Sequence, residues 1–549
     1  MAVRTRPRAA ALAGLLVAVA PFTMGAAQPG PAVDTGRADL AASLPLGSKD
    51  LPETRSTQRL AAGVALTTIV RGRVAPGDHW TVDVAIPAGE LPPSPDPDAP
   101  SSVLGTRDAA TAVAARLTAA GYRPSVVEER NPAYADLPAG TQGFTVQVGR
   151  FPDPAGANAL VKKLKPLGFK GVGTFSGGER TQTDGPWVLH ELVIDPHRFT
   201  GRIEEFHGGS QTGRRTTSEL AALGGALAAV NGGYFVMDPA AGAPGQPIGA
   251  VVEHGRLLHE ATGGRIAAIL RDGGRRVEFT GLRTTLLLRL RGGTHTVAGL
   301  NRSPGLIPNC GQPGDRPSPA PLMDVTCTKP DETVVLTPEY GSAPPAGPGA
   351  QAVLDPAGTV VSVGPRDGRP VPAGDTVVQS IGTEADWLTG NLPVGSRVSL
   401  EGTVTDGQGH EVRFGPDDSV IAGGPKLLTG GTPDIRPVAD GLVHPGDPSY
   451  FYGWGVRRNP RTAIGTDRAG RIILFQADGR RPGYSQGLSL DEEAGVLRAF
   501  GATDAMNLDG GGSSAMYTAR TGLVGRPSDP TGERPVGNAL LVLPSAARR

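Results

Sequence analysis

The chain has 549 residues and equal numbers of basic and acidic side chains, 53 Lys and Arg against 53 Asp and Glu. A formal charge of zero argues against a nucleic-acid partner and against a charged membrane surface. The 80 glycines, the 52 prolines and an aromatic content of 5% argue against a helical bundle. They favour two or three domains of short strands and loops, an α+β fold.

The N-terminus has the pattern of an export signal. Arg4, Arg6 and Arg8 precede an apolar run at 9–20, and small residues follow at 25–27. The run is too short to cross a bilayer, so we expect residues 1–27 to be a signal peptide, with an uncleaved anchor as the alternative. No later segment has the length and apolarity of a transmembrane span, so we expect a secreted protein.

Residues 28–78 form a polar lead-in or linker, broken by Pro and Gly, in which only 64–70 has the pattern of a strand. The two cysteines, Cys310 and Cys327, lie much later, in a Pro- and Gly-rich stretch. In an exported chain they are expected to form one disulfide, which would stabilise the fold by about 3 kcal/mol in the chain-entropy model. Neither has a nearby His or a helix start, so a catalytic cysteine is the weaker interpretation.

Residues 79–178 alternate between strand and helix patterns. The helix at 154–167 is expected to bury Ala159, Leu160, Leu164 and Leu167. The order is β-α-β-β-α-β, the plan of a ferredoxin-like domain with two helices on one face of a four-stranded sheet. Strands are expected at 80–86, 125–127, 143–149 and 171–175, and helices at 105–120 and 154–167.

The sequence GFTVQVGRF at 143–151, followed by a helix with Ala157 and Leu164 and then by Leu167-Gly168-Phe169, resembles the SPOR family. This resemblance implies that 79–178 binds the glycan strands of peptidoglycan, on the exposed face of the sheet. The proline-rich insert at 91–100 departs from the family pattern. A packing domain without a ligand is the alternative.

From 186 to 545 the chain is rich in strand patterns, and several motifs place polar residues at turns. Alternating segments at 267–270, 284–290, 333–336, 352–354, 377–381 and 397–404 predict a mixed or antiparallel sheet assembly. Asn231 opens an Asn-Gly-Gly turn, Arg461 and Thr462 end the block Arg-Asn-Pro-Arg-Thr, and Asp478 follows the strand at 471–476. Each motif alone is also an ordinary turn or a surface arginine.

The most distinctive motif is Asn507-Leu508-Asp509-Gly510-Gly511-Gly512-Ser513-Ser514, which is flanked by apolar residues. Glycine permits positive φ and close approach, so successive amides can face one oxyanion beside the Asp509 carboxylate. A glycine-rich turn between two strands is the alternative. Shortly before it, Ser489 and Glu492 form the capping box of a helix.

Taken in chain order, the motifs at Asn231, 422–428, 458–465, Asp478 and Asn507 closely resemble the phosphodiester glycosidase family over residues 186–545. The stretch 309–323 does not match and is expected to be an insertion. The resemblance implies hydrolysis of a sugar phosphodiester.

The chemistry of this reaction suits the motif residues. Arg461 and the amides of Gly510, Gly511 and Gly512 would hold the phosphate. Asp478 or Asp509 would stabilise an oxocarbenium-like sugar or activate water, and their roles stay open. The polar side chains expected to bind substrate are those of Asn231, Thr462, Asn507 and Ser513.

The sequence therefore predicts a secreted hydrolase of glycosyl phosphodiesters that a glycan-binding domain targets to the cell wall. Two alternatives are a wall-binding protein with an inactive glycosidase fold and an ordinary peptidoglycan glycosidase. No cofactor motif is evident. No His or Cys ligand cluster is visible either, although an oxygen-ligated Ca²⁺ or Mg²⁺ has too weak a signature to be read from a sequence.

Overall fold

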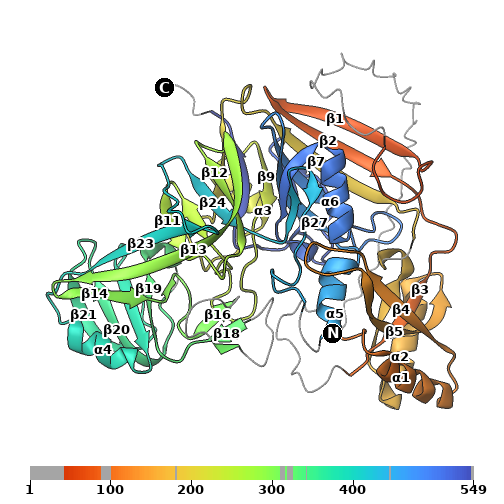
Figure 1. Cartoon of the computed structure of the whole chain (residues 1–549), viewed down its shortest axis with the longest axis horizontal. Coiled ribbons are helices and arrows are strands. Elements are labelled where there is room, and N and C mark those ends of the chain that lie inside the picture. The colour runs from red at the N-terminus through yellow and green to blue at the C-terminus, as the bar shows by residue number, and fades with distance from the viewer. Residues whose placement is uncertain are drawn as a thin grey trace, which may run out of the picture. The chain divides into compact units, whose positions relative to one another are not determined.

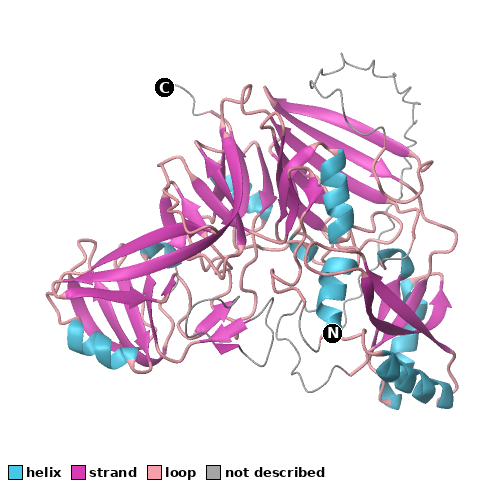
Figure 2. Cartoon of the chain, viewed as in Figure 1, coloured by secondary structure: helices cyan, strands magenta, loops and turns pink. Residues whose placement is uncertain are grey.

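The computed structural model describes residues 43–87, 101–179, 182–308, 316–317, 326–341, 343–443 and 447–545. The described residues belong to one compact unit, Asp39–Arg549. The predicted signal peptide, the insert at 91–100, most of the predicted insertion 309–323, and Cys310 lie outside them, so these predictions and the disulfide stay predictions. Strands predominate over a small number of helices, which confirms the α+β class (Figure 2). None of the described helices is long and apolar enough to cross a membrane.

The largest sheet has eight strands, in the order β1-β2-β7-β28-β27-β29-β25-β26, and every pair is antiparallel. The predicted strand at 64–70 is β2, and its partners are β1 and β7, so the lead-in contributes two strands to this sheet (Figure 1). The strands are β1 (Glu53–Ala61), β2 (Val64–Arg71), β7 (Trp187–Ile194), β28 (Ile472–Ala477), β27 (Arg461–Asp467), β29 (Ala502–Asn507), β25 (Lys426–Thr429) and β26 (Thr432–Pro433).

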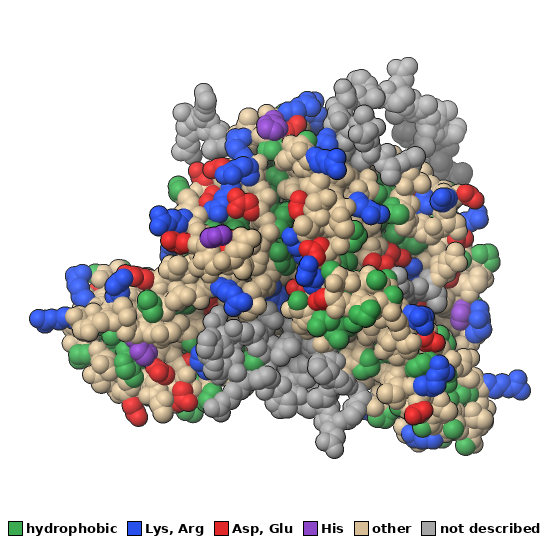
Figure 3. Space-filling view, viewed as in Figure 1, with side chains coloured by type: hydrophobic (Ala, Val, Ile, Leu, Met, Phe, Trp, Pro, Cys, Tyr) green, Lys and Arg blue, Asp and Glu red, His purple; other side chains and the backbone are tan. Residues whose placement is uncertain are grey.

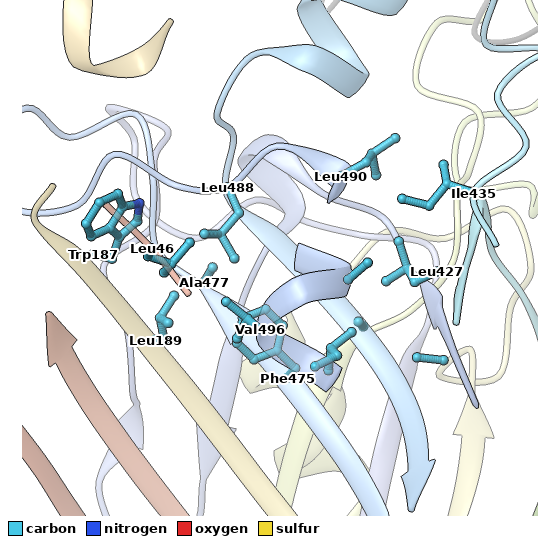
Figure 4. Packing of buried hydrophobic residues seen from close by; sticks show 14 of the residues in the cluster. Leu46, Trp187, Leu189, Leu427, Ile435, Phe475, Ala477, Leu488, Leu490 and Val496 are labelled. Carbon is cyan, nitrogen blue, oxygen red and sulfur yellow. The ribbon is translucent and has the colours of Figure 1, made fainter. Parts of the chain in front are cut away.

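Both faces of this sheet are buried, because its side chains alternate between two hydrophobic cores. Phe475 packs on one face against helix α6 (Leu490–Ala499), and its neighbour Leu474 packs on the other. Figure 4 shows Phe475, Leu189 and Val496 in the first core. The predicted capping box of α6 is present: Ser489 accepts from the Glu492 amide, and the Glu492 carboxylate accepts from the Ser489 amide.

Two further sheets pack on the second face, through Val230 and Leu540 of one sheet and Ala268 and Ile421 of the other. The first has the order β31-β30-β9-β32-β8 and the second β11-β10-β24-β12-β13-β14, with β23 paired to β13. Their strands are β31 (Gly522–Leu523), β30 (Met516–Thr518), β9 (Ala228–Asn231), β32 (Ala539–Leu543), β8 (Arg202–Phe206), β11 (Arg256–His259), β10 (Val251–Glu253), β24 (Ser419–Ala422), β12 (Ile266–Arg271), β13 (Arg276–Leu290), β14 (Gly293–Val297) and β23 (Ser399–Asp406), with helix α3 (Thr217–Gly224) beside β9 and β32.

A five-stranded sheet, β15-β19-β22-β20-β21, carries helix α4 (Glu384–Asn391), and a small sheet has the order β16-β18-β17. Five of the six alternating segments predicted from 267 to 404 fall within strands, and the sixth, 397–404, lies in β23 from residue 399 onward. The antiparallel assembly is confirmed apart from the parallel pair β15 and β19. The strands are β15 (Gly299–Leu300), β19 (Glu332–Leu336), β22 (Thr376–Ile381), β20 (Gly347–Leu354), β21 (Val360–Arg366), β16 (Leu306–Pro308), β18 (Thr326–Thr328) and β17 (Arg316–Pro317).

The N-terminal region has the predicted element order, and its sheet has the order β4-β5-β3-β6 with antiparallel pairs. On α2 the buried residues are Ala157, Leu160 and Leu164, so the prediction that Ala159 and Leu167 are buried is wrong. The α-helix ends at Leu164 and continues as a 3₁₀ turn, which breaks the 3.6-residue period. The elements are β3 (Trp80–Val84), α1 (Arg107–Ala119), β4 (Pro124–Asn131), β5 (Gly140–Phe151), α2 (Pro154–Leu164) and β6 (Gly171–Phe175).

Basic and acidic side chains are interspersed over the face of the molecule seen in Figure 3, as a net charge of zero leads one to expect. Helix α5 (Pro448–Phe451) runs into a π-helical turn at Tyr452–Val456. This turn comes just before the Arg-Asn-Pro-Arg-Thr block and supplies part of the site described next.

Candidate active site

The Asp509 motif joins β29 of the eight-stranded sheet to β30 of the sheet β31-β30-β9-β32-β8. Three main-chain hydrogen bonds fix it: Leu508 N donates to Thr462 O (2.7 Å), Asp509 N to Gly232 O (3.0 Å), and Gly511 N to Pro460 O (3.0 Å). Gly511 has φ 59°, a left-handed conformation that favours glycine. The turn therefore brings together three motifs separated by up to 280 residues in the chain, roughly half its length.

Asn231 holds this turn through both ends of its buried side chain. Its Nδ2 donates to the Asp509 carbonyl oxygen (2.7 Å), and its Oδ1 accepts from Thr462 Oγ1 (2.7 Å) and from the Ala515 amide (3.1 Å). Both residues were predicted to bind substrate. Because the Asn231 amide already makes its hydrogen bonds inside the protein, it can affect a substrate only by positioning Asp509. The Thr462 hydroxyl helps to hold the Asn231 side chain in place.

Asn507 connects the Asp509 turn to a fourth motif, the glycine turn at 422–428. Its Nδ2 donates to Tyr234 Oη (3.0 Å) and to the carbonyl oxygen of Gly424 (2.8 Å), to which Tyr234 also donates (2.6 Å). The Asn507 Oδ1 is buried and has no hydrogen-bond partner in the described part of the chain. Buried acceptors are seldom left unpaired, so this oxygen is suited to a ligand hydroxyl.

Arg461 is buried, with 4% of its surface exposed, and its direction is fixed by main-chain acceptors. Its Nε donates to Leu488 O (2.9 Å) and its Nη2 to Trp454 O (2.6 Å). Only the Nη1 edge of the guanidinium makes no hydrogen bond within the described residues. The N–H groups of Nη1 are therefore available to a phosphate oxygen, together with the electrostatic effect of the charge.

Arg480, to which the sequence assigned no role, is exposed and lies directly beside the glycine turn. A Cβ on Gly511 would lie 3.3 Å from Arg480 Nη2 and 3.5 Å from the Trp454 ring. Arg480 Nε donates to Asn459 Oδ1 (3.0 Å), and the guanidinium lies 5.7 Å from the centre of the Trp454 ring. Glycine at 511 is thus favoured by its φ angle, and the exposed Arg480 guanidinium lies against the turn.

The predicted amide cradle is only partly available. The Gly511 amide donates to Pro460, whereas the amides of Gly510 and Gly512 make no hydrogen bond within the described ranges. Arg534 and Asp529, joined by a 2.8 Å ion pair, lie against Gly512 and leave no room for a side chain there. Ser513 Oγ is buried and has no hydrogen-bond partner among the described residues.

The charges around Asp509 interact with one another. Burial raises the pKa of the Tyr234 hydroxyl, Arg265 and Arg461 oppose that shift, and the negative charge of Asp509 adds to it. Burial also raises the pKa of Glu493, on α6, to about 8 against the charge of Arg461. Glu493 is therefore largely protonated at neutral pH. Nothing in the sequence pointed to Arg265. Tyr234 and Glu493 lie in or beside sequence motifs, but only other residues of those motifs were predicted to be functional.

Asp478, the second carboxylate predicted to be catalytic, has a different environment. Its oxygens accept from Tyr484 Oη (2.7 Å), from Gln476 Nε2 (2.9 Å) and from the Arg526 amide (3.0 Å). Burial alone would raise the pKa of Asp478, but His190, Gln476 and Tyr484 hold that pKa below its ordinary value. The carboxylate therefore stays ionised and fastens the 525–526 turn, which favours Asp509 as the reacting group.

In the N-terminal region, the sheet face opposite the helices is covered. Thr81, Asp83, Thr145 and Thr174 on this face are each at most 3% exposed. Glu179 lies against this face and pairs with Arg457 (3.1 Å), and burial followed by the Glu179 charge raises the pKa of Asp83 to about 7. The exposed glycan-binding face implied by the sequence resemblance is therefore not exposed in this structure.

Two family models match the chain. A phosphodiester glycosidase model matches residues 349–543, and a SPOR domain model matches residues 140–189. Each match covers only part of the corresponding predicted domain, so the boundaries 79–178 and 186–545 stay predictions.

One solved structure and two curated proteins are also similar to this chain. A crystal structure from Burkholderia pseudomallei, described as an exported protein, is 32% identical, with a TM-score of 0.81 over 92% of this chain and 99% of that one. Two curated relatives, from Mus musculus and Homo sapiens, are named N-acetylglucosamine-1-phosphodiester alpha-N-acetylglucosaminidase. They are 48% and 45% identical over 69 residues, which is 13% of this chain and 13% of each relative.

Proposed function

Because this chain belongs to the phosphodiester glycosidase family and carries a SPOR domain, we propose that it hydrolyses the sugar–phosphate bond of a glycosyl phosphodiester. The observation that carries the proposal is the convergence of four motifs on the Asp509 turn. Arg480 lies against Gly511 of this turn, and the charges of Asp509 and Arg461 both act on the Tyr234 hydroxyl. The export described for the Burkholderia relative and the N-terminal sequence pattern support a secreted protein.

The arrangement suits the reaction. Cleavage of the bond between the sugar carbon and the phosphate oxygen releases a phosphate monoester anion, so the site needs cations and amide donors more than it needs a general acid. We assign Arg480, the Nη1 edge of Arg461 and the amides of Gly510 and Gly512 to the phosphate. Asp509 would act on the sugar, as the nucleophile or as the base that activates water. The open acceptor of Asn507 and the Ser513 hydroxyl would bind sugar hydroxyls.

The test is to incubate the purified protein with two substrates that share one sugar: the methyl phosphodiester of N-acetylglucosamine 1-phosphate and a neutral aryl N-acetylglucosaminide. Preferred hydrolysis of the phosphodiester, at kcat/KM at least about 100-fold higher, is the expected result, since one electrostatic contact contributes about 10²–10³. Equal rates would identify an ordinary glycosidase. No hydrolysis of either substrate would favour an inactive glycosidase fold.

For the N-terminal region we propose a ferredoxin-like domain that binds peptidoglycan glycan strands, as the SPOR match supports. Since the sheet face is covered, binding there requires the face to separate from Glu179 and Tyr452. Arg457 is the cation among three carboxyl groups at this contact, Asp83, Glu129 and Glu179.

Arg457→Ala would leave these carboxyl groups without a cation and weaken the contact. We therefore expect the variant to sediment with purified peptidoglycan more strongly than the native chain. The control is Arg413→Ala, which removes an exposed arginine paired with Glu411. Unchanged sedimentation of the Arg457 variant would exclude this face as the glycan-binding surface.

A further inference from the structure

A buried group of three side chains lies apart from the Asp509 turn, between the sheet β31-β30-β9-β32-β8 and the sheet β11-β10-β24-β12-β13-β14. Glu205 lies on β8, and His207 follows two residues later, on the same side by strand alternation. Glu253 ends β10, which contacts β8. One ligand atom from each residue lies within 4.8 Å of the others. The group therefore brings two carboxylates and one imidazole from two sheets to one point.

The protein does not satisfy these groups by itself. Glu205 is fully buried: its Oε1 accepts from Asn538 Nδ2 (2.9 Å), and its Oε2 has no hydrogen-bond partner in the described part of the chain. His207 is 4% exposed, and neither ring nitrogen has a hydrogen-bond partner among the described residues. Its Nδ1 lies 3.4 Å from Glu253 Oε2. Buried polar atoms are rarely left unpaired without a ligand, an ion or ordered water.

The chemistry of the three groups points to a cation rather than to water. Two buried carboxylates repel each other, and a divalent cation would neutralise both. Neither nitrogen of the buried His207 ring has a hydrogen-bond partner among the described residues, and a neutral imidazole offers a lone pair to a metal. Carboxylate oxygens together with an imidazole nitrogen are ligands that Zn²⁺ and Mn²⁺ accept, whereas Ca²⁺ and Mg²⁺ favour oxygen ligands alone.

We propose that Glu205, His207 and Glu253 bind one divalent transition-metal cation of the Zn²⁺ or Mn²⁺ class. The ion closes the contact between the two sheets, and water or a further oxygen completes its coordination. The site also connects to the Asp509 turn: Asn538, which donates to Glu205, accepts from the Gly233 amide (3.1 Å) and from the Gly232 amide (2.9 Å). Gly232 in turn accepts from the Asp509 amide. The bound ion is thus a structural support for the loop that positions Asp509.

The test measures metal content and stability, which do not depend on the proposed enzymatic activity. The full chain is treated with EDTA, dialysed and reloaded with Zn²⁺ or Mn²⁺ alone, and elemental analysis gives the metal bound per chain. We expect one ion per chain and a melting temperature that rises when the metal is added and falls again with EDTA. An unchanged melting temperature and no stoichiometric metal would overturn the proposal.

Variants assign the ion to these residues. Glu205→Gln retains an acceptor for Asn538 but removes one charge, and His207→Phe removes the imidazole, so both should lose the bound metal. The matched control is His295→Ala, because His295 pairs with Glu384 (2.7 Å) outside this group, and this variant should retain the metal. Stoichiometric metal in both Glu205→Gln and His207→Phe would also overturn the assignment.

Discussion

Replacing Asn231 with alanine tests whether the Asp509 turn is held in place by this one side chain. The variant would leave three buried groups without their partners: the Thr462 hydroxyl, the Ala515 amide and the Asp509 carbonyl oxygen. Each unsatisfied group costs about 1–3 kcal/mol. Since water can enter the space, we expect the free energy of unfolding to fall by roughly 3–5 kcal/mol, less than the typical stability of about 5–15 kcal/mol. The variant should fold.

Activity should fall more than stability alone explains. A displacement of a reacting group by about 1 Å costs on the order of 100-fold in rate, so kcat on the phosphodiester should decrease at least that much, with a smaller change in KM. The matched control is Gln379→Ala. This buried residue also makes three hydrogen bonds, with Arg366, Pro345 and Gln351, but on β22 in another sheet.

The assay combines a thermal melt with steady-state kinetics below the melting transition of each variant. Both variants should melt at lower temperature, and only Asn231→Ala should lose kcat. If Asn231→Ala retained native kcat, the claim that this residue positions Asp509 would be refuted.

Three further predictions concern charged groups around the site. Arg461→Lys should lower kcat/KM on the phosphodiester by about 10-fold or more, because lysine cannot donate to both Leu488 and Trp454 and still face the site. Steady-state kinetics measure this, and a native kcat/KM would contradict the prediction. Asp478→Asn should lower the melting temperature more than it lowers kcat, because its carboxylate fastens the 525–526 turn; a native melt with lost turnover would show that it is catalytic. The Glu493 pKa of about 8 in the folded protein lies above the ordinary glutamate value of 4.5, so its contribution to stability is present below about pH 4.5 and is lost as pH rises to about 8. Glu493→Gln should therefore melt higher than the native chain at pH 8 to 9 and not at pH 4.5, and equal melting differences at both pH values would show that burial does not shift this carboxyl.

The sequence predicted local features where the signal was local. The cap of α6, the strand at 471–476 and the element order of 79–178 all depend on residues within a few positions of one another. The use of glycine for positive φ in this turn was also predicted for a sound reason, since Gly511 has a left-handed φ angle.

The features that the sequence did not predict depend on long-range pairing. Nothing near β2 indicates that it pairs with β7, and nothing near Asn231 shows that both ends of its amide are used on residues more than 200 positions away. For the same reason Arg480 was passed over, because its importance comes from its packing against Gly511. Burial of the sheet face at Asp83 likewise depends on Glu179 and the 452–458 segment.

The central claim is that Asp509 is the reacting carboxylate of a phosphodiester glycosidase. The most direct measurement is kcat/KM for the native chain and for Asp509→Asn on the methyl phosphodiester of N-acetylglucosamine 1-phosphate, together with a melt of each protein. The substitution keeps the shape of the side chain and removes its charge. The account predicts an unchanged melting temperature and a loss of at least about 100-fold, the scale of one lost acid–base or nucleophilic group. Turnover within a few-fold of native by the folded variant would contradict it.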